Sequence, residues 1–287
     1  MKLNFIAEVS SNHSKNLNRC IEFINRSADI GCDSVKFQLF KIDQLFAPEI
    51  LQRSGELAKR KKWELPLDFL EPLSEQCKKR AIKFSCTPFY LEAVDELLPY
   101  VDFYKIASYE LLWDDLLSAC AKTGKPIIIS TGMATPDEIS HAVKVLKTNG
   151  CSDLTLLHCT SAYPTPYKEA NLSAIQTIRD LTGCEVGWSD HTVDPGVIHR
   201  SIHRWGANTI EFHLDLDGKG EEYGSGHCWL PDQIGAVIQQ IHHGFDADGN
   251  GIKGPIDSEK KERMWRADPS DGLRPIKSIR ADAIPNS

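Results

Sequence analysis

Short strand-type runs alternate with amphipathic helix-type stretches along most of the chain. In the helix-type stretches apolar residues recur three and four positions apart, as at Ile139, Val143 and Leu146. The strand-type runs are Phe5–Val9, Ser34–Gln38, Ile82–Cys86, Phe103–Ile106, Pro126–Ser130, Leu154–His158, Glu185–Trp188 and Thr209–Phe212. The helix-type stretches include Leu17–Ile30, Leu67–Arg80, Leu91–Leu98, Pro136–Thr148, Asn171–Leu181, Pro195–Trp205 and Pro231–His243. This alternation predicts parallel strands joined by right-handed crossover helices.

Eight such units in 287 residues predict a closed (β/α)8 TIM barrel rather than an open doubly wound sheet. No Gly-x-Gly-x-x-Gly follows the first strand, which argues against a dinucleotide-binding fold. We expect the barrel over residues 1–253 and a C-terminal tail over 254–287 that packs on the barrel or on a partner. The insertion Phe40–Pro66 is predicted to be an irregular lid or dimer-contact loop, with its basic run Lys59–Lys62 exposed to solvent.

Composition narrows the class of protein. The net charge of -7 argues against a nucleic-acid-binding surface, and no apolar run approaches the roughly 18–20 residues of a membrane span. The nine cysteines are scattered and never form a Cys-x-x-Cys pair. This spacing argues against a disulfide framework or a zinc knot and fits a reducing compartment, so we expect a cytoplasmic protein.

Two histidines, His191 and His213, follow two successive strand-type runs. If those strands are parallel neighbours, both imidazoles project into one barrel mouth, where they could bind a divalent metal. Glu211 precedes His213 by two positions and would share its face of the strand. The alternative is a pair of hydrogen-bonded histidines at strand ends, without a metal.

Most of the other predicted strands also end in polar residues, which we expect to converge on the same mouth as an active site. Lys36 and Lys105 stand among apolar residues, where an unpaired ammonium group is costly to bury. They predict a pocket for a small phosphate or carboxylate, and the alternative is an internal salt bridge with a residue such as Glu8 or Glu110. A Schiff-base role for either lysine also stays open.

Ordered motifs along the chain resemble the N-acetylneuraminate (sialic acid) synthase family. The motifs are Ile6-Ala-Glu-Val-Ser-Ser-Asn-His13, Val35-Lys-Phe-Gln38, Ser85-Cys-Thr-Pro-Phe89, Tyr104-Lys-Ile-Ala-Ser108, Ser130-Thr-Gly-Met133, Leu157-His-Cys-Thr160, Tyr163-Pro-Thr-Pro166, Ser189-Asp-His-Thr192 and Ile210-Glu-Phe-His213. They extend from about residue 5 to residue 231, which is nearly the whole predicted barrel.

The resemblance implies an enzyme that condenses phosphoenolpyruvate with an N-acylated six-carbon aldose, giving a nine-carbon 2-keto-3-deoxy sugar acid and phosphate. It implies a divalent metal, Mn²⁺ first with Mg²⁺ or Co²⁺ as alternatives, on His191 and His213. It assigns phosphoenolpyruvate binding to Lys36, Thr87, Lys105, Ser108, Ser130, Ser161 and Ser189. It assigns sugar binding to Glu8, Gln38, Tyr163 and Glu211, and catalysis to Glu8, Glu211, His191 and His213. We expect a homodimer.

Three departures from the family pattern concern the sugar acceptor. The usual Gly-Pro-Asp-His reads Gly224-Ser-Gly-His227 here, so Gly226 replaces an acidic residue. Phe212 stands where a basic residue is common, and the C-terminal antifreeze-like domain of most members is not predicted. We therefore expect an altered acceptor preference. A catalytically altered paralogue that binds sugar or phosphate, and a different metal-dependent barrel aldolase or hydrolase, remain alternatives.

Overall fold

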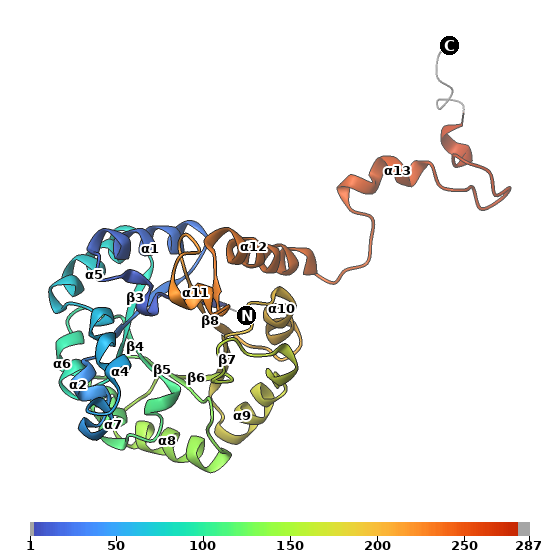
Figure 1. Cartoon of the computed structure of the whole chain (residues 1–287). Helices are drawn as coiled ribbons and strands as arrows, with labels where there is room; N and C mark the ends of the chain where they lie inside the picture. The colour runs from blue at the N-terminus through green and yellow to red at the C-terminus, as the bar shows by residue number, and fades with distance from the viewer. Residues whose placement is uncertain (1–2, 281–287) are drawn as a thin grey trace. The chain divides into compact units, whose positions relative to one another are not determined.

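The computed structural model describes residues 3–280 and contains a closed parallel barrel, which confirms the predicted TIM barrel. Its strands are β1 (Asn4–Glu8), β2 (Ser34–Leu39), β3 (Lys83–Pro88), β4 (Phe103–Ile106), β5 (Ile127–Ser130), β6 (Leu154–His158), β7 (Glu185–Asp190) and β8 (Thr209–Leu214). Each strand pairs in parallel with the next, and β1 pairs with β8, which closes the ring seen end-on in Figure 1. Beyond the prediction, a short β9 (Cys228–Trp229) pairs with β8.

Helices between the strands surround the barrel (Figure 1). They are α1 (Leu17–Asp29), α5 (Leu70–Lys79), α6 (Glu92–Leu97), α7 (Asp114–Lys122), α8 (Pro136–Thr148), α9 (Ala174–Thr182), α10 (Pro195–His203) and α12 (Pro231–Asp248). Helix α8 illustrates why they form where the periodicity predicts. Thr135 and Glu138 make a capping box at its start, and its apolar face, with Val143 and Leu146, is buried.

The prediction of an irregular loop over Phe40–Pro66 is wrong. The segment contains α2 (Ile42–Leu45), α3 (Pro48–Leu51), α4 (Gly55–Lys59) and a 3-10 turn (Arg60–Trp63). Pro48 occupies the first turn of α3, and the Ser54 side chain caps α4 by accepting from the Leu57 backbone N–H. These helices are each about one turn long, too short to produce a recognisable apolar period.

Inside the barrel an apolar layer lies below the polar residues of the mouth. Ile6, Phe103, Ile128 and Leu157 form one buried cluster. On β1, β4 and β5 the residues two positions further along are Glu8, Lys105 and Ser130. Because side chains two apart share a strand face, these polar groups stand directly above the apolar layer. They are therefore held on packed strands rather than on loops.

The chain divides into two compact units, Met1–Ile241 and His242–Ser287. The second unit contains α13 (Lys260–Met264) and an ion pair between Arg280 and Asp271. The predicted barrel boundary at residue 253 stays a prediction, and residues 1–2 and 281–287 lie outside the described part. All nine cysteines are buried and free. Among the described residues no helix combines the length and apolar character needed to span a membrane.

Candidate active site

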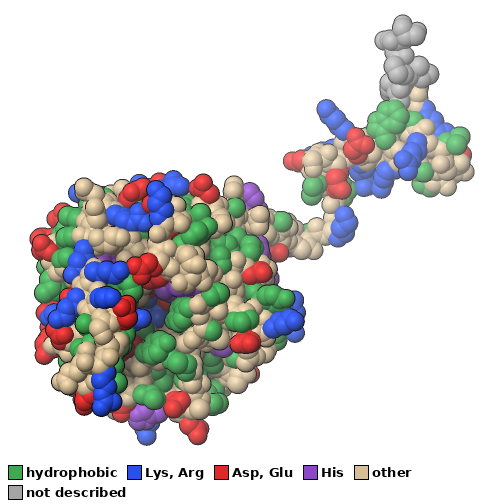
Figure 2. Space-filling view, viewed as in Figure 1, with side chains coloured by type: hydrophobic (Ala, Val, Ile, Leu, Met, Phe, Trp, Pro, Cys, Tyr) green, Lys and Arg blue, Asp and Glu red, His purple; other side chains and the backbone are tan. Residues whose placement is uncertain are grey.

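A pocket of about 840 Å³ opens at the carboxyl ends of the barrel strands. Figure 2 shows this face of the barrel, which is hollowed near its middle. The pocket is lined by the predicted site residues Glu8, Lys36, Gln38, Lys105, Ser108, Ser130, Tyr163, Ser189, His191, Glu211 and His213. The two other predicted residues lie close behind this lining: Thr87 accepts a hydrogen bond from Lys36 (3.4 Å), and Ser161 lies beside Gly132. The predicted residues therefore meet in one place.

Two buried lysines and two buried glutamates alternate in the mouth. The Lys36 ammonium contacts the Glu8 carboxylate and lies 3.6 Å from Glu211 Oε2. Lys105 Nζ lies 3.6 Å from Glu211 Oε1. The internal salt bridge with Glu8 that we considered from the sequence is thus present on Lys36, and Glu211 is the carboxylate that both lysines share. Gln38 donates to Glu8 Oε1 (3.4 Å), and so does the Ser10 backbone N–H (2.6 Å).

Burial and charge set the protonation of this cluster. Burial lowers the pKa of Lys36 to about 8, although the Glu211 carboxylate opposes the change. Burial alone would raise the pKa of Glu211, but the ammonium groups of Lys105 and Lys36 outweigh it and hold that pKa below its ordinary range. Glu211 is therefore a carboxylate at neutral pH, and it can accept a proton or a hydrogen bond.

Hydroxyl groups surround the Lys105 side of the pocket. Lys105 Nζ donates to Ser130 Oγ (2.7 Å), and Ser189 Oγ donates to Glu211 Oε1 (3.1 Å). The Gly132 backbone N–H donates to Ser108 Oγ (3.0 Å). A Cβ on Gly132 would clash with Ser161 Oγ and lie 2.8 Å from Ser108 Oγ, so only glycine lets the backbone approach these hydroxyls. An ammonium group with several hydroxyls is a suitable set for a small anion.

His191 and His213 lie side by side, with ring centroids 5.4 Å apart. His191 Nδ1 lies 2.9 Å from the Thr160 carbonyl oxygen, and His213 Nδ1 lies 2.9 Å from Glu222 Oε2. Both partners can only accept, so each Nδ1 carries a proton and donates it. Burial lowers the pKa of His191 to about 3, which keeps that ring neutral. In both rings Nε2 is thus the nitrogen left for a divalent metal.

Tyr163 packs over the histidines at the rim of the pocket. Its ring centroid lies 4.3 Å from that of His191 and 5.2 Å from that of His227. The side chain is 42% exposed, so one part of it remains available to a ligand in the mouth. Tyr163 begins the segment Tyr163-Pro-Thr-Pro166, which follows β6 in the chain.

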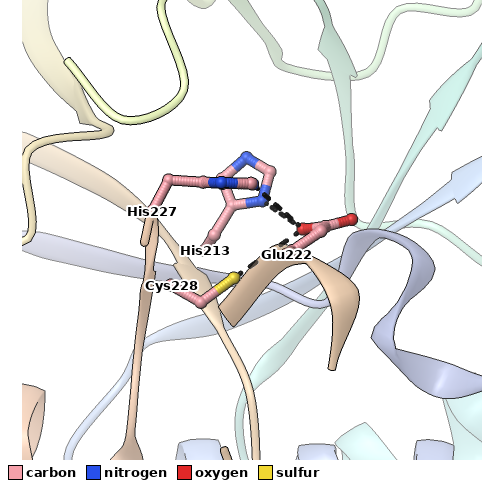
Figure 3. A group of neighbouring side chains, drawn as sticks. All are labelled: His213, Glu222, His227 and Cys228. Atoms are coloured by element: carbon pink, nitrogen blue, oxygen red, sulfur yellow. Dashed lines mark hydrogen bonds and ion pairs between the residues drawn. The ribbon is translucent and has the colours of Figure 1, made fainter. Parts of the chain in front are cut away.

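The sequence pattern did not single out Glu222 and His227 as site residues. Both line the pocket, and Figure 3 shows Glu222 pointing toward His213 and His227. Burial alone would raise the pKa of Glu222, but the hydrogen bond with His213 and the nearby His227 imidazole outweigh it and hold that pKa well below its ordinary range. Glu222 stands in α11 (Glu221–Gly224), beyond any strand, so no periodic signal marks it.

Glu110 is a second acidic group whose place the sequence did not reveal. We considered it only as a salt-bridge partner for a lysine, yet it lines the pocket and is 8% exposed. Its Oε2 is buried without a hydrogen-bond partner among the described residues. Burial raises its pKa to about 7. Glu110 is therefore a side chain that can give or take a proton near neutral pH.

The insertion after β2 forms an apolar wall of the pocket. The wall consists of Ile42, Leu45, Phe46, Trp63 and, from the loop after β3, Phe89. The basic run Lys59–Lys62 is exposed, as predicted, but Arg60 also lines the pocket, and its guanidinium carbon lies 5.5 Å from the Trp63 ring centroid. One guanidinium group of the run is thus part of the mouth.

Comparison with known proteins agrees with this fold and with the family resemblance. The model of the NeuB family matches residues 23–253. The chain is 38% identical to the N,N'-diacetyllegionaminic acid synthase of Campylobacter jejuni, over 89% of this chain and 80% of the relative. It is 30% identical to a pseudaminic acid synthase of the same species, over 92% and 80%.

Among solved structures, the N-acetylneuraminic acid synthetase of Leptospira borgpetersenii superposes with a TM-score of 0.78. The two chains are 29% identical, and the match covers 91% of this chain and 90% of that one. The resemblance inferred from the motifs is confirmed. The chain is an enzyme of the synthase type and belongs to the NeuB family.

Proposed function

We propose that this enzyme condenses phosphoenolpyruvate with an N-acylated hexose-type aldose to give a nine-carbon 2-keto-3-deoxy sugar acid and phosphate. One observation carries the proposal: two buried lysines, a set of hydroxyls and a pair of neighbouring histidines share one barrel mouth. The related synthases make sugar acids of this kind, as their names state. Neither a hydrolase nor a Schiff-base aldolase accounts for the lysines, hydroxyls and histidines together.

Phosphoenolpyruvate would bind on the lysine and hydroxyl side. One of its two anionic groups, carboxylate or phosphate, would be held by Lys105 with Ser108, Ser130, Ser161 and Ser189. The second anionic group would be held by Lys36 with Thr87. The two ammonium groups neutralise carboxylate and phosphate while charge moves between them. The anion would compete with Glu8 and Glu211 for the lysines, so binding exchanges internal ion pairs for contacts with the substrate.

His191 and His213 would hold a divalent metal, Mn²⁺ first, through their Nε2 atoms. When bound, the metal supplies a Lewis acid that polarises the aldehyde carbonyl of the acceptor. The residues fit such an ion because both Nδ1 atoms are already occupied by acceptors.

The reaction forms a carbon–carbon bond between the phosphoenolpyruvate methylene and the aldehyde carbon. Water then adds to the former enol carbon, and the phosphate leaves with its bridging oxygen. The attacking water loses both of its protons: one ends on the former aldehyde oxygen, and the other leaves on the phosphate as its C–O bond breaks and the ketone forms. Glu8 and Glu211 are the carboxylates beside the lysines that could accept and return these protons.

The acceptor half of the pocket favours a sugar with apolar substituents. The wall of Ile42, Leu45, Phe46 and Trp63 suits the methyl groups of acyl or deoxy positions. Gln38, Tyr163 and Arg60 supply polar contacts at the same side. Because Gly226 replaces an acidic sugar contact of the family, we infer a preference for an acceptor other than plain N-acetylmannosamine.

Phosphate release tests the proposal directly. Purified protein with Mn²⁺ and phosphoenolpyruvate is given a panel of N-acyl hexosamines and deoxyhexoses, and phosphate and keto acid are measured together. We expect both products in equal amounts with at least one acceptor, and neither with a His191→Ala/His213→Ala variant. A folded, metal-loaded protein that binds phosphoenolpyruvate but forms no keto acid with any acceptor would instead identify a catalytically altered paralogue.

A further inference from the structure

Glu222 contacts the turn after β1 with one side of its carboxylate and His213 on β8 with the other. One carboxylate oxygen, Oε1, accepts from the Ser11 hydroxyl (2.7 Å) and backbone N–H (3.2 Å). The other, Oε2, lies 2.9 Å from His213 Nδ1 and 3.6 Å from His227 Nε2. The Glu222 side chain is only 16% exposed. Figure 3 shows the carboxylate directed at the histidines from α11.

The distances identify which of these contacts is a hydrogen bond. The 2.9 Å between Glu222 Oε2 and His213 Nδ1 is an ordinary hydrogen-bond length, whereas 3.6 Å to His227 is too long. Cys228 Sγ lies 3.8 Å from the same oxygen, and the Asn12 side-chain amide donates to this sulfur (3.6 Å). His213, Glu222, His227 and Cys228 could together surround an ion. The short Nδ1–Oε2 contact instead favours one charge-assisted hydrogen bond.

The loop that carries Glu222 is fixed on its N-terminal side. Arg19 on α1 pairs with the buried Asp215 (2.9 Å), whose carboxylate also accepts from the backbone N–H of Leu216 (2.9 Å) and Gly220 (3.0 Å). Gly220 passes so close to Asn12 that a Cβ would lie 2.5 Å from its Oδ1. Because these contacts already order the loop, little additional conformational entropy is lost when the Glu222 carboxylate is held toward His213.

We propose that Glu222 is a positioning residue that holds His213 in the tautomer and orientation required for metal binding. The carboxylate accepts the Nδ1 proton, leaves the Nε2 lone pair for the metal and strengthens the ring as a ligand. The inference rests on the proposed function, since it takes His213 as a metal ligand. It gives a role at the metal site to an acidic residue in the loop after β8. This role is separate from that of Glu8 and Glu211, the carboxylates proposed to act on the substrate.

The test measures Mn²⁺ affinity of the metal-free full chain by electron paramagnetic resonance, without turnover. We expect Glu222→Ala to weaken binding by about 10–100-fold, the effect typical of losing such a partner. Glu222→Gln keeps a hydrogen-bond acceptor but loses the charge, so its Mn²⁺ affinity should lie between those of the parent protein and Glu222→Ala. Glu221→Gln is the matched control, because the neighbouring Glu221 is exposed and pairs with Lys62 (2.8 Å). The Glu221→Gln protein should bind Mn²⁺ as tightly as the parent protein. Ser11→Ala removes one contact to Oε1 and should weaken binding a few-fold.

The outcomes separate this inference from the proposed function. Normal Mn²⁺ affinity in folded Glu222→Ala and Glu222→Gln proteins, with binding lost in His213→Ala, overturns the positioning role alone. Normal affinity in His213→Ala shows that the metal site itself is assigned wrongly. A thiolate-to-metal charge-transfer band in the Co²⁺ protein, lost in Cys228→Ser, would make Glu222 and Cys228 part of a four-donor site and overturn the positioning role. Reduced thermal stability with unchanged affinity would assign Glu222 a structural role only.

Discussion

The Lys105 ammonium lies 3.6 Å from the Glu211 carboxylate, and both side chains are almost completely buried in the barrel mouth. Glu211 also faces Lys36, so its charge offsets part of two buried ammonium groups. Removing one partner of a buried pair leaves an uncompensated charge. We expect Glu211→Gln to lower the free energy of unfolding by about 3 kcal/mol at pH 7 in urea titrations.

The matched control for that substitution is Glu56→Gln, in an ion pair with Lys59 whose side chains are both exposed. An exposed pair contributes less than about 1 kcal/mol, so the control should unfold almost like the parent protein. Equal stability of the Glu211→Gln variant and the parent would contradict the view that Glu211 neutralises the lysines.

Lys36 and Lys105 should be required for phosphoenolpyruvate binding, because a phosphate beside a carboxylate needs fixed positive charge. Replacing either with Met keeps the aliphatic stem and removes the charge. We expect calorimetry to show at least about tenfold weaker binding, or roughly 1.4 kcal/mol. Lys41→Met is the control, since Lys41 pairs with Glu96 (3.4 Å) outside the pocket lining. Parent-like affinity in both variants would place the anion site elsewhere.

Metal content should depend on His191 and His213 together. After dialysis against Mn²⁺, the parent protein should retain one ion per chain, and a His191→Ala/His213→Ala variant should retain none. The control is a second histidine pair, His199 and His203 on α10, whose rings stack 5.8 Å apart. A His199→Ala/His203→Ala protein should keep its ion. Elemental analysis that finds the same content in all three proteins would refute the assignment.

Glu110 should make stability depend on pH. Its pKa in the folded protein is about 7, above the ordinary 4.5, so the folded state holds an extra proton between these values. Stability is then complete below pH 4.5 and declines as pH rises toward and through 7, by roughly 3 kcal/mol. Glu110→Gln stays neutral and should lose this decline. Parallel unfolding free energies of parent and variant from pH 4.5 to 8 would show that Glu110 is not the cause.

The acceptor preference should differ from that of the ordinary sialic acid synthases. Loss of a buried charged contact costs more than about 2 kcal/mol against the substrate that used it, so N-acetylmannosamine should be a poor acceptor here. Relative kcat/KM values across amino- and deoxy-hexoses measure this. If N-acetylmannosamine turned over fastest of all, the interpretation of Gly226 would be wrong.

The residues on the strands could be predicted from sequence because general rules place them. Period-two alternation and barrel closure bring Lys36, Lys105 and Glu211 to one end, whatever the detailed packing. The position of Glu222 could not be predicted, since it depends on contacts such as Arg19 with Asp215, which are remote in sequence. The apolar pocket wall that includes Phe46 could not be predicted for another reason. The helices of this segment are about one turn long, so their apolar residues do not repeat often enough to show a helical periodicity.

The groups proposed for the chemistry come from strand ends all around the barrel, whereas most of the apolar wall comes from one contiguous stretch, residues 40–66. Under the proposed function, the apolar part of acceptor recognition and bond formation are therefore encoded in separable parts of the chain. A single recombination event that exchanged this stretch between relatives could change which sugar is elongated and leave the phosphoenolpyruvate half untouched. New sugar acids would then arise by replacement of one segment rather than by rebuilding the barrel.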